Sequence, residues 1–288
     1  MAGIIRVGVA GWTYAPWRGA FYPGEIRREQ ELGYAASRFR VLEINDTFYG
    51  PLRPEMFAGW MEQVPADFVF AVKAPRQITH VLRLRDAGVA LANFLASGLL
   101  RLEAHLGPIL WQLPPNLRFD PVGMQAFLKM LPHDTGHAAM LGRAHDRSLR
   151  GAAWLEVATR RPMRHAIEVW HESYRCPAFI ELLRAHDVGL VCADRAGWAP
   201  LMDVTAGFVY CRLLGVADGV GGQGYDHAAL QAWSRRLKAW AGGEEPADAL
   251  LLAGRDRPRR RDVFVVFDSA RKLRAPANAL ELVRRLRA

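Results

Sequence analysis

Residues 40–50, "RVLEINDTFYG", combine a strand pattern with polar residues that an apolar strand does not need. Leu42 and Ile44 are typical of a buried strand. Residues two apart on a strand share a face, so Glu43 and Asn45 point one way while Leu42 and Ile44 point the other. The stretch therefore predicts a strand that carries a carboxylate and a carboxamide on one face near its C-terminal end.

Seven further apolar, β-branched or aromatic runs are also typical of strands, and they alternate with segments of helical periodicity. The predicted strands are "IIRVGVAGW" (4–12), "RVLEIN" (40–45), "FVFAVKAP" (68–75), "GPILWQLPP" (107–115), "HAIEVWH" (165–171), "GLVCAD" (189–194), "FVYCRLLG" (208–215) and "VFVVFDS" (263–269). The predicted helices cover 29–39, 54–63, 89–106, 123–131, 149–160, 177–186, 227–240 and 275–288, and none is predicted within 195–206. Eight such units in 288 residues fit an α/β fold, a closed (β/α)8 TIM barrel, as a single domain over 1–288. An open doubly wound sheet is the alternative.

Polar side chains recur at the C-terminal ends of seven of these strands, in phase with small or apolar residues. Helices cover the outer face of barrel strands, so that face is expected to be apolar and the polar groups are predicted to line the C-terminal mouth, where barrel enzymes keep their chemistry. The alternative is that these groups only form ion pairs or satisfy loop backbone. The predicted ring consists of Glu43, Asn45, Lys73, Gln112, Glu168, Asp194, Arg212 and Asp268.

Acids and bases mixed in one mouth can act as general acid and general base, because neighbouring charges move their pKa values apart. We assign proton transfer to Glu43 and Glu168, and the holding of charge to Lys73 and Arg212, whose planar fork suits phosphate or carboxylate. A buried ion-pair network without turnover is the structural alternative. The expected substrate contacts are Trp12, Asn45, Tyr49, His80, Gln112, Asp194, Tyr210 and Asp268.

The segment "GVGGQG", residues 219–224, formally matches a dinucleotide-binding glycine pattern. It follows strand seven without a tight strand-to-helix turn, and no acidic partner ends a strand about twenty residues later, so we reject that interpretation. Loops after strands seven and eight often hold phosphate in TIM barrels. A weaker phosphate site is therefore predicted at Gly221, Gly222, Arg271 and Lys272, with a plain loop as the alternative.

No cofactor is predicted, because the chain has no H-E-x-x-H motif. A divalent metal ion is the lesser alternative, and its ligands would come from His80, His171, Glu43, Glu168 and Asp194. The three cysteines are odd in number and lack C-x-x-C spacing, which argues against a disulfide framework and a thiolate zinc site.

The net charge of +9 favours anionic partners. Arginines concentrate in "RDRPRRRD" (255–262) and "LELVRRLRA" (280–288). These are interpreted as a solvated loop and a polar helix face, with a nucleic-acid or acidic-partner patch as the alternative. The N-terminus reads as a strand and no apolar run is long enough to span a bilayer, so a cytoplasmic protein without membrane contact is expected; its oligomeric state stays open.

The same residues carry a resemblance to a known family. The segments "VGVAGWTYAPWRGAFYP", "LEINDTFY", "FVFAVKAPRQITH", "LGPILWQLPP", "AIEVWH", "FVYCRLLG" and "VFVVFDSARKLRAPANA" resemble, in order, the YecE-like family, or domain of unknown function 72. The resemblance implies a TIM barrel and no established reaction. This chain departs from the family at Trp170, where Arg is usual, and at Leu214, where His is usual.

Together these observations predict an enzyme, a hydrolase or lyase more readily metal-independent than metal-dependent. It would act on an anionic, phosphate-containing small molecule or a nucleic-acid end. The alternative is a non-catalytic module that binds a ligand or nucleic acid, and the replacements at Trp170 and Leu214 favour it.

Overall fold

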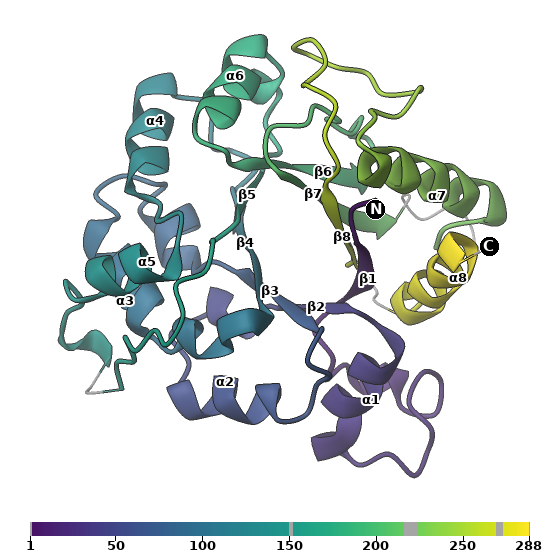
Figure 1. Cartoon of the computed structure of the whole chain (residues 1–288), viewed down its shortest axis with the longest axis horizontal. Coiled ribbons are helices and arrows are strands. Elements are labelled where there is room, and N and C mark those ends of the chain that lie inside the picture. The colour runs from purple at the N-terminus through teal and green to yellow at the C-terminus, as the bar shows by residue number, and fades with distance from the viewer. Residues whose placement is uncertain (1, 150–151, 216–223, 269–272, 288) are drawn as a thin grey trace. The chain divides into compact units, whose positions relative to one another are not determined.

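The computed structural model describes residues 2–149, 152–215, 224–268 and 273–287 (Figure 1). Its eight parallel strands form a closed barrel in chain order, and β8 pairs with β1. The predicted (β/α)8 barrel is thus confirmed. The strands are β1 (Ile5–Ala10), β2 (Val41–Ile44), β3 (Val69–Lys73), β4 (Leu106–Gln112), β5 (His165–Glu168), β6 (Gly189–Arg195), β7 (Phe208–Gly215) and β8 (Asp262–Phe267).

Helices alternate with these strands, and their starts follow local sequence signals. Proline, which fixes a helical φ and has no N–H to satisfy, opens three of them, and an aspartate caps three by accepting a first-turn N–H. The α-helices are α1 (Glu31–Arg38), α2 (Pro54–Met61), α3 (Gly88–Ala96), α4 (Pro121–Met130), α5 (Thr135–Gly142), α6 (Pro177–Ala185), α7 (His227–Gly242) and α8 (Ala275–Arg287). Shorter turns of helix are η1 (Ala15–Trp17), η2 (Arg28–Gln30), η3 (Asp46–Phe48), η4 (Gln77–Val81), η5 (Leu99–His105), η6 (Arg147–Leu149) and η7 (Glu172–Tyr174).

Residue contacts divide the chain into two compact units. The first unit comprises residues 1–43 and 175–288, and the second unit comprises residues 44–174. In the first unit, β1 pairs with β2 and β8, and β7 pairs with β6 and β8. In the second unit, β4 pairs with β3 and β5.

The strands are buried on both faces, as parallel strands covered by helices require. Trp111 of β4 shows the outward packing: its ring makes edge contacts with Phe94 of α3 and Phe127 of α4, at centroid distances of 6.0 and 5.1 Å. Gly8 of β1 lies so close to β2 that a Cβ there would stand 1.6 Å from the carbonyl oxygen of Val41. Only glycine therefore fits that strand position.

Two helix predictions are wrong, and both errors lie in the second unit. The predicted helix 89–106 breaks at Gly98, which has a φ of +101°, and a separate helix η5 follows. The predicted helix 149–160 has no helical residue between 152 and 160. There the N–H of Trp154 instead donates to the carbonyl of Ala96, so this backbone pairs with the end of α3. The helix after β4 that sequence reasoning missed is α5.

The segment 195–206, to which no helix was assigned from the sequence, contains none. No helix in the described part of the chain has the length and apolar character that a bilayer crossing would need.

Candidate functional site

Four polar side chains meet at the C-terminal ends of β2, β7 and β8, within the first unit. The Arg212 guanidinium donates to both carboxylate oxygens of Glu43, from Nε to Oε2 at 3.1 Å and from Nη2 to Oε1 at 3.0 Å. The Tyr210 hydroxyl donates to the same Oε2 at 2.6 Å. Arg212 Nη2 also donates to Oδ2 of Asp268. We call these four residues the carboxylate network.

Strand alternation and register put the network together. Tyr210 and Arg212 lie two apart on β7 and so share a face. Glu43 is held on β2 by pairing with β1, and its carbonyl accepts a hydrogen bond from the N–H of Gly11 at 2.9 Å. Asp268 follows β8 directly, and its N–H donates to a carbonyl of β7 at 3.1 Å. Each carboxylate therefore reaches Arg212 from a backbone that is itself fixed.

The network is deeply buried and formally negative. The side chains of Glu43 and Arg212 are 0% exposed, and that of Asp268 is 19% exposed. Two carboxylates share one guanidinium, which leaves a formal charge of −1. Removing such charges from water costs several kcal/mol per ion, roughly, and that cost is recovered only by close ion pairs and hydrogen bonds of this kind. Asp268 is the member of the network that solvent reaches.

A second group of polar side chains lies in the second unit, around the end of β3. The Lys73 ammonium stands 4.3 Å from the centroid of the Phe48 ring, in a cation–π contact, and the His80 ring meets the same Phe48 edge-on at 5.1 Å. His80 Nδ1 lies 2.8 Å from the Thr79 hydroxyl. Burial lowers the pKa of His80, and the positive charges of Lys73 and Arg76 lower it further. A neutral imidazole able to accept a proton therefore lies beside an ammonium group.

The other ring residues of the second unit lie on neighbouring strand ends. Gln112 of β4 donates from Nε2 to Oε2 of Glu168 on β5 at 3.1 Å, and the Glu168 side chain is fully buried. Asn45 has a buried Oδ1 that finds no hydrogen-bond donor among the described residues. Tyr49 is 75% exposed and contacts Phe48 edge-on at 5.3 Å.

Comparison with known proteins places the chain in a family. The model of a protein family of unknown function, DUF72, matches residues 6–288. The chain belongs to the DUF72 family. This confirms the resemblance inferred from the sequence motifs. The chain is also 30% identical over 133 residues to UPF0759 protein YecE of Escherichia coli K12. That alignment covers 45% of this chain and 45% of YecE.

Two solved DUF72 structures share the fold. A DUF72 protein of Thermotoga maritima superposes with a TM-score of 0.74 at 22% identity, over 99% of this chain and 100% of that one. A DUF72 protein of Enterococcus faecalis superposes with a TM-score of 0.65 at 18% identity, over 99% of this chain and 98% of that one. At these identities the likeness shows the fold alone, so the roles of individual DUF72 residues must be argued from their chemistry.

One ring residue of this DUF72 chain points the other way. Asp194 was predicted to face the mouth, but its Oδ2 accepts a hydrogen bond from Nε1 of Trp233, on helix α7, at 2.9 Å. The register explains the error. Ala193, not Asp194, pairs with the network residue Arg212, and Asp194 pairs with Leu213 on the opposite face of β7. Asp194 therefore holds the covering helix to the sheet.

The remaining predictions concern the phosphate site, Trp12 and a metal site. Gly221, Gly222, Arg271 and Lys272, the predicted phosphate site, lie outside the described residues. Trp12 is buried, at 8% exposure, and its carbonyl accepts a hydrogen bond from a tyrosine hydroxyl. Among the described residues, no group of three or more His, Cys, Asp or Glu side chains is arranged to hold a metal ion.

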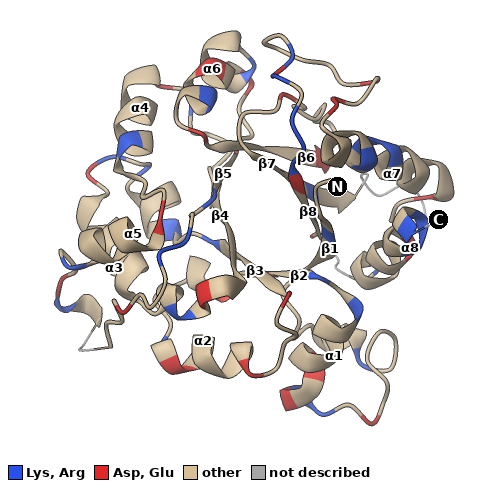
Figure 2. Cartoon of the chain, viewed as in Figure 1, with Lys and Arg blue, Asp and Glu red and all other residues tan. Residues whose placement is uncertain are grey.

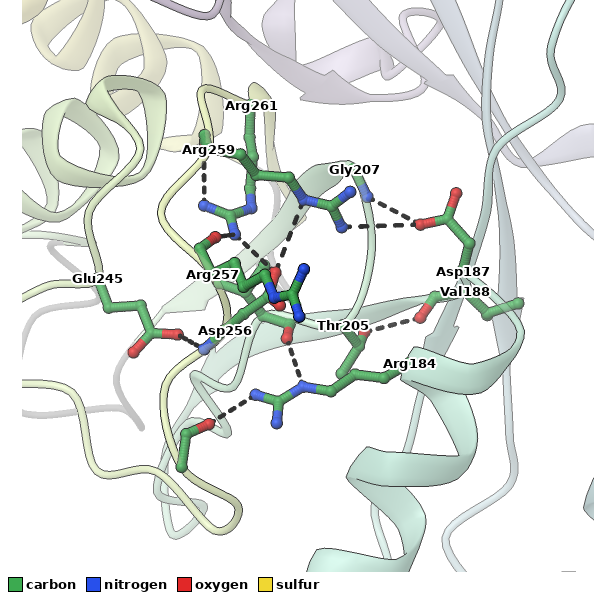
Figure 3. A network of polar contacts seen from close by, with 12 residues as sticks. Arg184, Asp187, Val188, Thr205, Gly207, Glu245, Asp256, Arg257, Arg259 and Arg261 are labelled. Atoms are coloured by element: carbon green, nitrogen blue, oxygen red, sulfur yellow. Dashed lines mark hydrogen bonds and ion pairs between the residues drawn. The ribbon is translucent and has the colours of Figure 1, made fainter.

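The arginine-rich loop before β8 is tied to carboxylates of the first unit, and Figure 3 shows Arg257, Arg259 and Arg261 near Asp256. Arg261 is buried and donates to Asp256 Oδ2 at 2.7 Å. Arg259 lies 3.6 Å from Asp256 and 3.9 Å from Asp187. Burial by itself would raise the pKa of Asp256, but hydrogen bonds led by that of Arg261 lower it. Part of the loop's charge thus serves the fold.

Further Lys and Arg residues lie along α7 and α8, where the ribbon is blue in Figure 2. On α8, Glu281 pairs with Arg284 and Arg285, each at 2.7 Å. A nucleic-acid patch on these basic surfaces stays a prediction.

Sequence reasoning missed a cleft in the second unit. Its volume is about 360 Å³, and it is lined by residues 82–85, residues 116–120, the first turn of α4 and Tyr174. The available signal was the clustering of arginines in the loops after the third and fourth predicted strands, at Arg83, Arg85 and Arg118.

Proposed function

We propose that this DUF72 chain is an enzyme that uses general acid–base chemistry at the C-terminal ends of its barrel strands, on an anionic, phosphate-containing small molecule or nucleic-acid end. The carboxylate network carries the proposal. A barrel core needs no buried ion pairs, since apolar residues of similar volume usually stabilise a fold as well or better. Charged groups placed at this end of barrel strands are the usual sign of chemistry.

The contacts suggest a role for each network residue. Asp268 is the partly exposed carboxylate, so it is the group that would take a proton from a substrate. Arg212 would position Asp268, and Glu43, with the Tyr210 hydroxyl on its Oε2, would hold Arg212 in place. Arg212 is thus a positioning residue in this proposal and not the anion anchor that its residue type suggested, because its fork is occupied by Glu43.

The second unit has candidate groups of its own, and among them Lys73 is the cation suited to hold an anionic group. Its ammonium stands on a ring face and its side chain is partly exposed. Neutral His80 would be the proton acceptor beside Lys73. Glu168, bound by Gln112, would play the proton-transfer part predicted for it only if that hydrogen bond opens.

One observation favours the alternative, a non-catalytic binding module. The Arg212 guanidinium is fully buried and already satisfied by two carboxylates of its own chain, an arrangement that also suits a purely structural ion pair. The two functions differ in turnover, which makes the test direct.

The test compares Asp268→Asn with Asp262→Asn. Asp262 is a matched control because it lies at the other end of β8, where it pairs with Arg6 at 3.3 Å. The assay follows phosphate release and ultraviolet absorbance changes for a panel of phosphorylated sugars, nucleotides and short 5′-phosphorylated oligonucleotides. Loss of a general base costs a factor on the order of 100 or more in rate, so Asp268→Asn should lose turnover while Asp262→Asn keeps it. Turnover equal in both variants would contradict the assigned base, and a panel that binds without turnover would establish the module.

A further inference from the structure

The cleft of the second unit has the size and composition of a ligand site. Its volume of about 360 Å³ falls within the range of small-molecule pockets, roughly 300–1,000 Å³. Three loop segments that follow β3, β4 and β5 surround it, all of them at the C-terminal ends of their strands. None of the residues that line this cleft belongs to the carboxylate network.

The lining is positively charged. It holds three arginines and one aspartate, a formal charge of +2. Arg85 and Asp120 are 3.8 Å apart and their side chains are 78% and 50% exposed, so this pair is loose and contributes little, typically about 0–1 kcal/mol. Arg83 and Arg118 form no ion pair with any described carboxylate. The positive charges of these two guanidinium groups are therefore not cancelled by a carboxylate of the cleft.

The arginine loop is held in an uncommon conformation. Arg83, Leu84 and Asp86 have φ values of 51°, 70° and 48°, in the left-handed region that side chains with a Cβ rarely adopt. Each such residue costs on the order of 1–3 kcal/mol, and such strain gathers at ligand clamps and active sites. The Leu84 N–H donates to the Ile78 carbonyl at 3.0 Å, which fixes the loop.

A hydrogen bond ties the first arginine to the opposite loop. Arg83 donates from Nη2 to the carbonyl of Asn116 at 2.9 Å, across the cleft from the loop after β3 to the loop after β4. Its guanidinium is thereby oriented before any ligand arrives. Its two Nη atoms donate to the side-chain and backbone oxygens of Asn116, which leaves three of its five N–H groups for phosphate oxygens. An arginine held in place in this way loses little side-chain entropy on binding.

The remaining wall is aromatic and aliphatic. The Phe119 and Tyr174 rings contact each other at 5.4 Å between centroids, and the Phe119 N–H donates to Ser173 Oγ at 2.8 Å, which ties these loops together. Leu82, Leu117 and Met124 complete the lining. Such a surface suits the ring or other apolar body of a ligand, while the arginines suit its charge.

We propose that this cleft binds a small molecule that joins a phosphate group to a ring, with Arg83 and Arg118 holding the phosphate and Phe119 and Tyr174 packing on the ring. The site is a binding site in its own right and does not depend on proton transfer by the carboxylate network.

Calorimetric titration tests the proposal with three probes: phenyl phosphate, inorganic phosphate and phenol. Phenyl phosphate should bind most tightly, inorganic phosphate at least fivefold more weakly, and phenol without measurable saturation. Affinity for phenyl phosphate should fall as NaCl rises from 50 to 500 mM, since salt screens exposed charges.

Matched variants separate this site from general surface charge. Arg118→Gln should weaken phenyl phosphate binding about tenfold, and Arg83→Gln should weaken it at least as much. Arg143→Gln removes the same charge from an exposed position at the end of α5 and should leave the affinity within twofold. Asp268→Asn should bind phenyl phosphate as the parent does, so failure of the proposed acid–base function would leave this site intact. The site is refuted if phenyl phosphate shows no saturable binding, or if Arg118→Gln and Arg143→Gln weaken it equally.

Discussion

Replacing Arg212 by methionine tests whether the carboxylate network also stabilises the fold. Met fills a similar volume but carries no charge. The change removes both hydrogen bonds to Glu43 and the contact to Asp268, and it leaves the fully buried Glu43 carboxylate with the Tyr210 hydroxyl as its remaining network partner. Leaving one member of a buried ion pair without the other typically costs about 3–5 kcal/mol.

That loss is large beside a total stability of about 5–15 kcal/mol for a typical domain. With a urea dependence near 3 kcal/mol per molar for a chain of this size, the unfolding midpoint should fall by roughly 1–2 M. The assay is urea unfolding followed by tryptophan fluorescence. The control is Arg236→Met, because Arg236 also makes two hydrogen bonds to one carboxylate, that of Asp248, but at the surface, with side chains 22% and 54% exposed. Surface pairs contribute about 0–1 kcal/mol, so the control midpoint should barely move.

A double-mutant cycle completes the experiment. Glu43→Gln together with Arg212→Met should lose less stability than the two single losses added, by about 2 kcal/mol, because no buried Glu43 charge remains once both changes are made. The reasoning on the buried network is refuted if the urea midpoint of Arg212→Met falls no further than that of Arg236→Met. It is also refuted if the cycle shows no coupling between Glu43 and Arg212.

Three further predictions concern other ionisable groups. Burial raises the pKa of the Cys211 thiol, so at pH 8 a disulfide reagent should label Cys176 in the folded protein and all three cysteines only in guanidine; prompt labelling of three thiols without denaturant would contradict this. The Arg160 hydrogen bond, helped by a backbone N–H of α5, lowers the pKa of the helix cap Asp134 to about 2, so its stabilising effect is present above pH 4 and fades as the pH falls through 2. Asp134→Ala should therefore cost about 0.5–2 kcal/mol in urea unfolding at pH 7 and distinctly less at pH 2.5, and an unchanged deficit would be the contrary result. Burial lowers the pKa of His165 to about 4, so the folded state binds fewer protons than the unfolded state between pH 6.5 and 4. The free energy of unfolding should therefore decrease as the pH falls through that window, by at most about 1.4 kcal/mol per pH unit. His165→Gln should flatten the pH dependence of stability between pH 7 and 5. An equal slope of stability against pH in parent and variant would contradict the role given to His165.

Local patterns in the sequence were enough for the architecture. All eight strands and the helices α1, α2, α4, α6, α7 and α8 lie where periodicity predicts them. Periodicity works because a strand or helix buried on a regular face must repeat its apolar residues at the spacing of that element. The segment 149–160 failed because its helical pattern was overruled by a contact distant in sequence, the hydrogen bond from Trp154 to the end of α3.

The site, too, was predicted from local sequence patterns only in part. Alternation alone placed Glu43, Arg212 and Asp268 in one predicted ring, since residues two apart on a strand share a face and parallel strands end at one side. The structure brings these three together within the first unit and adds Tyr210, which was predicted only as a substrate contact. Alternation does not tell which face of a strand is the inner one. For β6, the face that carries Asp194 was wrongly taken as the inner face.

Only the tertiary structure decides such assignments, because a side chain's environment depends on the register between strands and on what packs over them. The pairing of Asp194 with Leu213 turns its carboxylate toward Trp233 of α7. Tertiary contacts also determine that Arg212 is satisfied by its own chain's carboxylates, while Arg83 and Arg118 line an open cleft. A sequence shows that an arginine is present, but the partner it meets comes from segments tens or hundreds of residues away, and those distances in space are set only when the chain folds.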